Sequence, residues 1–164
     1  DEAGENVFHF LGIELSFSGN KIKLTQHGLI KKLLDLTDMA DSKHQKTPAN
    51  LVPLGSDSDG KPFTEKWKYA SAVGMMMYLA ANAYPEIQFA VHQCARFTHC
   101  PRHIHVQDVK KICRYLKYAL DCNTGLTLNK EGGYQLDCYA DADFCGLWHQ
   151  DNDQDPVCMK RITC

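Results

Sequence analysis

The apolar positions along the chain switch from a period of two to a period of three to four, and later back again. Residues 7–17 are rich in β-branched, aromatic and aliphatic side chains, residues 18–21 contain Gly and Asn, and residues 22–25 alternate once more. This order predicts a β-hairpin, because Gly and Asn tolerate the positive φ angles of a tight turn. Gly12 interrupts the first strand, which is typical of a bulge or of a close approach by another backbone.

A helical period begins at residue 27, where apolar positions lie opposite Lys31 and Lys32, and it predicts an amphipathic helix that ends near Met39. Residues 41–66 have no sustained period and are rich in Pro, Gly, Ser and Asp, which predicts a linker or a long excursion of the chain. Three helices are expected after the linker: one from about residue 65 to residue 83, one from Pro85 until Pro101 ends it, and a third. The expected first helix is nearly encircled by the apolar residues Val73, Met76, Met77, Leu79 and Ala80, and the third carries a core stripe at Val106, Val109, Cys113, Leu116 and Leu120.

A second hairpin is predicted near the end of the chain, with strands at 125–129 and 134–139 and a Gly-containing turn between them. The predicted fold class is therefore α+β, with an N-terminal hairpin and helix, a central group of three helices, and a C-terminal hairpin that starts an incomplete mixed sheet. The corresponding units are residues 1–40, a linker at 41–66, a helical region at 67–122 and a C-terminal unit at 123–164.

The last predicted strand leads into a short acidic run. Leu136 and Cys138 fall on one face of the strand, and Asp141 falls on the other, so its carboxylate is presented to solvent. Because hard divalent cations prefer oxygen ligands, Asp141 is a candidate metal ligand, and a two-metal phosphodiesterase site would need further carboxylates. The alternative, that Asp141 to Asp143 form a solvated turn, stays open.

Charge is unevenly distributed, although the formal net charge is only −2. Residues 131–155 contain seven acidic residues and no Lys or Arg. A basic segment precedes them, with Asp108 as its one acidic residue. Phosphates need cations and metals need carboxylates, so this pattern favours a nucleic-acid enzyme with a metal site, and an ordinary solvated surface remains the alternative. The cations of the basic segment are Arg102, Lys110, Lys111, Arg114 and Lys117.

Cysteine usage indicates a reducing compartment. The chain has eight cysteines, no Cys-x-x-Cys pair and no cleavable apolar segment at its start. Free thiols and an intracellular location, cytoplasmic or nuclear, are therefore expected in place of secretion. The longest strongly apolar stretch, residues 73–83, is too short to span a bilayer, so no membrane partner is expected.

Eight short runs, in their order and spacing, resemble the copia-type retrotransposon polyprotein, and together they extend over nearly the whole chain. They are residues 10–15 (FLGIEL), 47–48 (TP), 69–79 (YASAVGMMMYL), 85–91 (PEIQFAV), 96–105 (RFTHCPRHIH), 114–117 (RYLK), 125–126 (GL) and 141–148 (DADFCGLW). The resemblance implies the part of the polyprotein that follows the reverse transcriptase core and runs into the ribonuclease H domain.

The resemblance also implies roles for individual residues. Phe10, Leu11, Gly12 and Ile13 match the primer grip, where Gly12 would let a primer backbone approach closely. The helix from residue 27 would be thumb-like. The three later helices would track the template–primer duplex, and their cations would contact phosphates without reading sequence. These cations are the five named above: Arg102, Lys110, Lys111, Arg114 and Lys117.

For chemistry, the resemblance makes Asp141 the first ribonuclease H carboxylate, with Asp143 beside it as a second candidate Mg²⁺ ligand. The polymerase motif Y-x-D-D does not occur in the chain, and the later ribonuclease H carboxylates are expected beyond Cys164. The chain alone is therefore expected to be inactive, to bind no Mg²⁺ tightly, and at most to bind RNA–DNA or DNA duplex and the remaining parts of the polyprotein.

The parent polyprotein would copy RNA into DNA, degrade the RNA strand and support DNA integration during transposition. Tyr84 and Ala70 stand where the family commonly or often has Arg, so a decayed element copy and a divergent branch are both open. An interpretation from another class is a co-opted, non-enzymatic interaction or structural protein.

Overall fold

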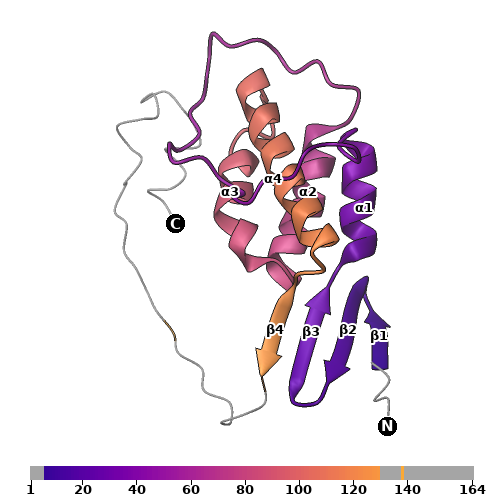
Figure 1. The fold of residues 1–164 in the computed structure, drawn as a ribbon. Helices are drawn as coiled ribbons and strands as arrows, with labels where there is room; N and C mark the ends of the chain where they lie inside the picture. Colours follow the sequence, from indigo (N-terminus) through magenta and orange to yellow (C-terminus); the bar gives the residue numbers. More distant parts are fainter. Residues whose placement is uncertain (1–5, 130–137, 139–164) are drawn as a thin grey trace.

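Four helices stand against one end of a four-stranded antiparallel sheet in the computed structural model, which describes residues 6–129 and Cys138 (Figure 1). The predicted α+β class is confirmed. The elements are β1 (Asn6–Phe10), β2 (Ile13–Ser18), β3 (Lys21–Thr25), α1 (His27–Leu36), α2 (Tyr69–Asn82), the 3₁₀ helix η1 (Pro85–Ile87), α3 (Gln88–Ala95), α4 (His103–Asp121) and β4 (Leu126–Asn129).

The sheet starts with three strands where the sequence pattern predicted two. The stretch 7–17 is not one strand, because the chain reverses at Leu11 and Gly12, whose φ angles are +49° and +77°. Phe10 pairs directly with Ile13, so Leu11 and Gly12 are the two central residues of a tight hairpin turn, and both have positive φ angles. Gly12 is therefore a turn residue and not a bulge within a strand. The signal was missed because Leu-Gly lacks the Asn or Asp that usually precedes Gly in such turns.

The strand at 126–129 joins the N-terminal sheet. β4 pairs antiparallel with β3, which gives the strand order β1-β2-β3-β4. Gly125 permits this approach, since a Cβ there would lie 2.2 Å from the Leu24 carbonyl oxygen. The expected partner of β4 in a separate C-terminal hairpin, residues 134–139, lies outside the described residues.

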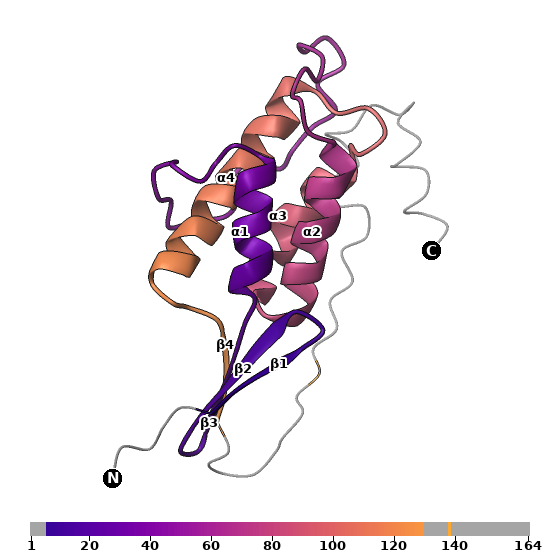
Figure 2. The same cartoon turned by 90° about the vertical axis from the view of Figure 1, so that its right-hand side faces the viewer.

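The hydrophobic core lies among the helices, and the sheet projects away from them (Figure 2). The helical periods predicted the buried positions well, with Val106, Val109, Cys113 and Leu116 all buried in α4. Met77 is an exception: it was expected in the apolar surround of its helix but is exposed in α2. Core residues come from all four helices and from the loop, and they include Ile30, Leu33, Met39, Leu54, Trp67, Ala72, Met76, Leu79, Val91, Cys94, Ile112 and Ala119.

The segment 40–66 contains no helix or strand, as a linker would, but it is not detached from the fold. Figure 1 shows it leaving α1, crossing the α4 and α3 helices, and returning over their far end to α2. Leu54 and Trp67 anchor it in the core, and Pro62 forms an isolated β-bridge with Arg102. This loop therefore covers part of the basic helix.

Candidate nucleic-acid interface

The β1–β2 turn stands at the mouth of a groove of about 350 Å³. The Tyr78 hydroxyl, from α2, donates a hydrogen bond of 2.8 Å to the Leu11 carbonyl oxygen and so ties the turn to the helices. The groove runs between the hairpin, the first turns of α1 and this tyrosine. Its lining residues are His9, Leu11, Gly12, Glu14, Gly28, Leu29, Lys32 and Tyr78.

The groove carries both charge signs. Glu14 accepts a hydrogen bond of 3.1 Å from the Thr25 hydroxyl, and its carboxylate lies 3.0 Å from His27 Nδ1. Lys32 is the one lysine or arginine among the lining residues of the groove. The Glu14 carboxylate is already bound by Thr25 of β3 and lies beside His27 at the start of α1. Lys32 is therefore the side chain of the groove that can bind an anion.

The four residues matched to the primer grip form and flank the turn. Phe10 is 64% exposed and Leu11 is 71% exposed, while Ile13 is half-buried. Sequence reasoning missed Lys32 and Tyr78 as neighbours of this turn, because they come from two different helices and only the fold brings them together.

Three of the five predicted phosphate-binding cations already have partners in the loop 40–66. Lys110 Nζ lies 2.8 Å from a carboxylate oxygen of Glu65, and Lys111 Nζ donates a hydrogen bond of 2.5 Å to Asn50 Oδ1. Lys117 Nζ donates to the Ala40 carbonyl oxygen. Lys110, Lys111 and Lys117 are therefore half-buried beneath the loop.

The other two cations differ in setting. Within the described residues, the Arg114 guanidinium makes no hydrogen bond or ion pair, whereas its backbone carbonyl accepts a hydrogen bond from the Gln45 N–H at 3.3 Å. Arg102 precedes the first residue of α4, and its backbone N–H donates to His105 Nδ1 at 2.8 Å. Arg114 is thus the cation of α4 most ready for an external anion.

His105 links the loop to the start of α4. Its ring is buried, stacks on Phe97 with 4.1 Å between the ring centroids, and places Nε2 2.9 Å from the Gly55 carbonyl oxygen. Because Nδ1 accepts the Arg102 N–H, the proton of the neutral ring is assigned to Nε2, which donates to Gly55. Burial lowers the pKa of His105 below its usual 6.5, and the nearby positive charges of Arg102 and Arg96 act in the same direction.

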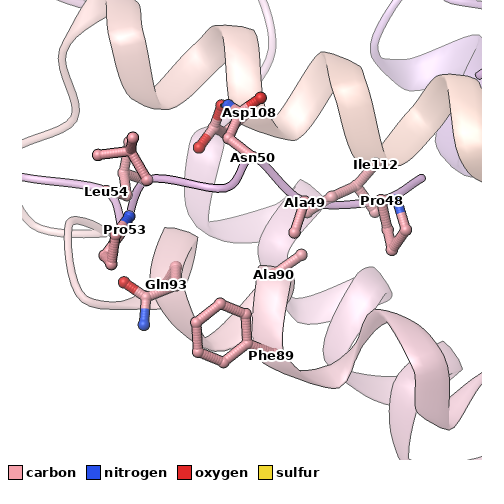
Figure 3. A pocket seen from close by; sticks show the side chains of 11 residues that line it. Pro48, Ala49, Asn50, Pro53, Leu54, Phe89, Ala90, Gln93, Asp108 and Ile112 are labelled. Atoms are coloured by element: carbon pink, nitrogen blue, oxygen red, sulfur yellow. The ribbon is translucent and has the colours of Figure 1, made fainter.

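The loop packs closely where it crosses α3 and α4. Figure 3 shows the seam, in which Asn50 lies beside Asp108 and the side chains of Phe89 and Gln93 come from α3. The cavity left there is about 10 Å³, close to the minimum that a single water molecule needs. Burial raises the pKa of Asp108, while Lys111 and the hydrogen bond from Asn50 lower it. The cavity between the loop and α3 is therefore too small for a ligand, whereas a wider groove of about 640 Å³ lies on the α4 side of the same loop residues, beside Asp108 and Lys111.

The metal-site candidates Asp141 and Asp143 lie outside the described residues. Within residues 6–129 and Cys138, no group of three or more His, Cys, Asp and Glu side chains is placed to hold a metal ion. The cysteines of that part, Cys94, Cys100, Cys113, Cys122 and Cys138, are free thiols. Across the same residues, every helix is too short or too polar to cross a bilayer.

Comparison with known proteins defines the class, because the relatives of this chain include retrovirus-related Pol polyproteins of transposons. The chain is 36% identical over 142 residues to the Pol polyprotein of transposon RE1 from Arabidopsis thaliana, which corresponds to 87% of this chain and 10% of that protein. It is 30% identical over 142 residues to the polyprotein of transposon RE2 from the same plant, with the same coverage. Transposon TNT 1-94 of Nicotiana tabacum follows, at 31% identity over 138 residues, 79% of this chain and 10% of that polyprotein.

The resemblance to the copia-type retrotransposon polyprotein is confirmed by these relatives, and the chain corresponds to one segment of such a polyprotein. It spans about a tenth of the length of the relatives named here. No protein-family model and no solved structure matches it.

Proposed function

We propose that this segment of a retrotransposon polyprotein holds the duplex of an RNA template and its DNA primer. One observation carries the proposal: residues 10–13, which the resemblance assigns to the primer grip, form an exposed hairpin turn that Tyr78 ties to the helices at the mouth of a groove containing Lys32. A tethered turn next to a cation is suited to positioning a sugar–phosphate backbone without reading its sequence.

The second contact of the proposed site is α4. Its Lys110, Lys111, Arg114 and Lys117 lie on a single helix, so that their charges can follow the phosphates of one strand. Arg102 adds a cation just before the helix begins. Duplex recognition of this kind is sequence-independent, and it would serve RNA–DNA and DNA duplexes alike.

No catalysis is assigned to the chain by itself. Its 164 residues contain no Y-x-D-D motif, so DNA synthesis would belong to other parts of a polyprotein. In such a polyprotein, Asp141 would be the first ribonuclease H carboxylate, and Asp143 would lie next to it. Mg²⁺, when bound there, would activate water and neutralise the scissile phosphate. Further carboxylates would be needed to hold the metal ion.

The test is duplex binding by charge-reversal variants. We expect Lys111→Glu with Arg114→Glu to weaken binding of a 20-base-pair RNA–DNA hybrid by about tenfold or more at low salt, because each lost phosphate contact also loses its counterion release. Lys32→Glu tests the groove separately and is expected to weaken binding by about threefold or more for the same reason. Fluorescence anisotropy of a labelled hybrid measures both.

The matched control is Lys21→Glu with Lys31→Glu, two exposed lysines on β3 and α1 that do not line the groove. This control makes the same change in net charge. If the control weakens binding as much as the α4 variant, Lys111→Glu with Arg114→Glu, then overall charge and not the proposed site governs binding.

The second candidate function, a co-opted interaction or structural protein, is favoured by one observation. Lys110, Lys111 and Lys117 already serve internal contacts, which are enough to explain why a helix of this fold is basic. If the α4 variant binds the hybrid as the wild type does, this second function becomes the better account.

A further inference from the structure

Residues 40–53, called the strap below, differ from the rest of the loop in how they are held. The strap lies between two buried residues, Met39 and Leu54, which are 6% and 5% exposed. None of its own residues is buried, and Leu51 is fully exposed. Ala49 is partly buried and packs against the core, so displacing the strap between its two anchors breaks this contact and leaves the fully buried residues in place.

Polar contacts attach the strap to α4. His44 Nε2 lies 2.6 Å from Asp121 Oδ2, with both side chains about half exposed. Asn50 Nδ2 donates to Asp108 Oδ1 at 2.6 Å, and the Gln45 N–H donates to the Arg114 carbonyl oxygen at 3.3 Å. Exposed contacts of this type are individually weak, because water competes for both partners.

Two further contacts use the cations of the proposed interface. Lys111 is bonded to Asn50 and Lys117 to the carbonyl oxygen of Ala40, so both acceptors are neutral groups of the strap. A phosphate oxygen is a stronger acceptor for an ammonium group than a neutral amide or carbonyl oxygen is. A duplex backbone can thus compete with the strap for the same two lysines.

We propose that the strap is an autoinhibitory cover of the basic helix, displaced when a nucleic-acid backbone takes its place on α4. The inference rests on the proposed function, because it concerns the regulation of the same site. In the closed state the strap occupies Lys111 and Lys117, and its Gln45 N–H bonds the backbone carbonyl of Arg114. Since only the open state offers both lysines to a phosphate backbone, the apparent duplex affinity is reduced by the fraction of open molecules.

The experiment loosens the strap without touching a cation of α4. His44→Ala with Asn50→Ala removes the contacts to Asp121, Asp108 and Lys111. We expect this variant to bind the RNA–DNA hybrid about threefold to tenfold more tightly than the wild type, because more molecules are open before binding. Leu51→Ala with Val52→Ala, at two exposed strap residues, is the matched control and is expected to leave the affinity unchanged.

Hydrogen exchange gives an independent measurement. The amide of Gln45 is protected in the closed state by its bond to Arg114, and we expect its exchange to accelerate both in the His44 and Asn50 variant and on addition of the hybrid to the wild type.

Two results would reject the autoinhibitory role of the strap without rejecting duplex binding. One is an unchanged affinity of the His44 and Asn50 variant while Lys111→Glu with Arg114→Glu still weakens binding. The other is an unchanged exchange rate of the Gln45 amide in the wild type when the hybrid is bound. Absence of hybrid binding by every form at low salt would instead reject the proposed function, and the strap as its regulator with it.

Discussion

At the scale of single residues, Leu11 and Gly12 set the shape of the proposed grip. Both have positive φ angles, and the reversal that they form turns one predicted strand into the two strands β1 and β2. The backbone of Leu11 is strained in this conformation, because a side chain disfavours positive φ angles, whereas glycine adopts them freely. The Tyr78 hydroxyl bond to the Leu11 carbonyl oxygen holds the strained residue in place.

Gly12→Ala is expected to lower the free energy of unfolding by about 1 kcal/mol, because alanine is disfavoured at a φ of +77°. Gly74→Ala in α2 is the control, since an added Cβ meets nothing within 4 Å at either glycine and only the backbone conformation differs. Alanine at position 74 should stabilise the helix by roughly 0.5–1 kcal/mol. Urea denaturation measures both, and loss of stability by the same amount in the two variants would contradict this explanation of the turn.

At the scale of elements, the sequence pattern predicted the four helices, but it did not reveal the split of residues 7–17 into two strands, the pairing of β4 with β3 or the attachment of the loop to α4. The helices were predictable because their apolar residues recur every three or four positions, as at Val106, Val109, Cys113 and Leu116. The pairing of β4 with β3 depends on contacts over about 100 residues, such as Leu24 with Leu126, that no local pattern encodes. The loop is attached to α4 by polar contacts that also join distant residues, as between Lys117 and Ala40, which are 77 positions apart.

His105 shows how the loop and α4 depend on pH. The folded protein holds this histidine with a pKa below 6.5, so the unfolded chain binds its proton at a higher pH than the folded chain does. The free energy of unfolding should therefore fall as the pH decreases below about 6.5, with a slope from this group of at most about 1.4 kcal/mol per pH unit. Burial is the main cause of the lowered pKa; the hydrogen bond to Gly55 and the negative charge of Asp57 oppose it, and the positive charges of Arg102 and Arg96 add to it.

Denaturation of His105→Gln between pH 7 and pH 5 is expected to show a shallower decline than the wild type. His92→Gln, at an exposed position of α3, should keep the decline of the wild type. A decline of wild-type steepness in His105→Gln would exclude His105 as its source.

At the scale of the whole molecule, α1 and the three later helices share one core, with Leu54 of the loop buried among them. Two regions of this unit carry the cations of the proposed interface: the groove at the β1–β2 turn, with Lys32, and the α4 helix, partly beneath the strap. The relationship to transposon Pol polyproteins supports the proposal that this unit contacts nucleic acid. The partner it contacts, a duplex backbone, is the central claim.

The dependence of hybrid binding on salt tests that claim most directly. If Lys110, Lys111, Arg114 and Lys117 contact phosphates, these four cations should contribute about −3 to −4 to the slope of the logarithm of the association constant against the logarithm of salt concentration, and contacts by Lys32 and Arg102 should make the slope steeper. Lys111→Glu with Arg114→Glu should make that slope shallower by about 2. A slope near zero, or one that this double variant leaves unchanged, would contradict phosphate contact by α4.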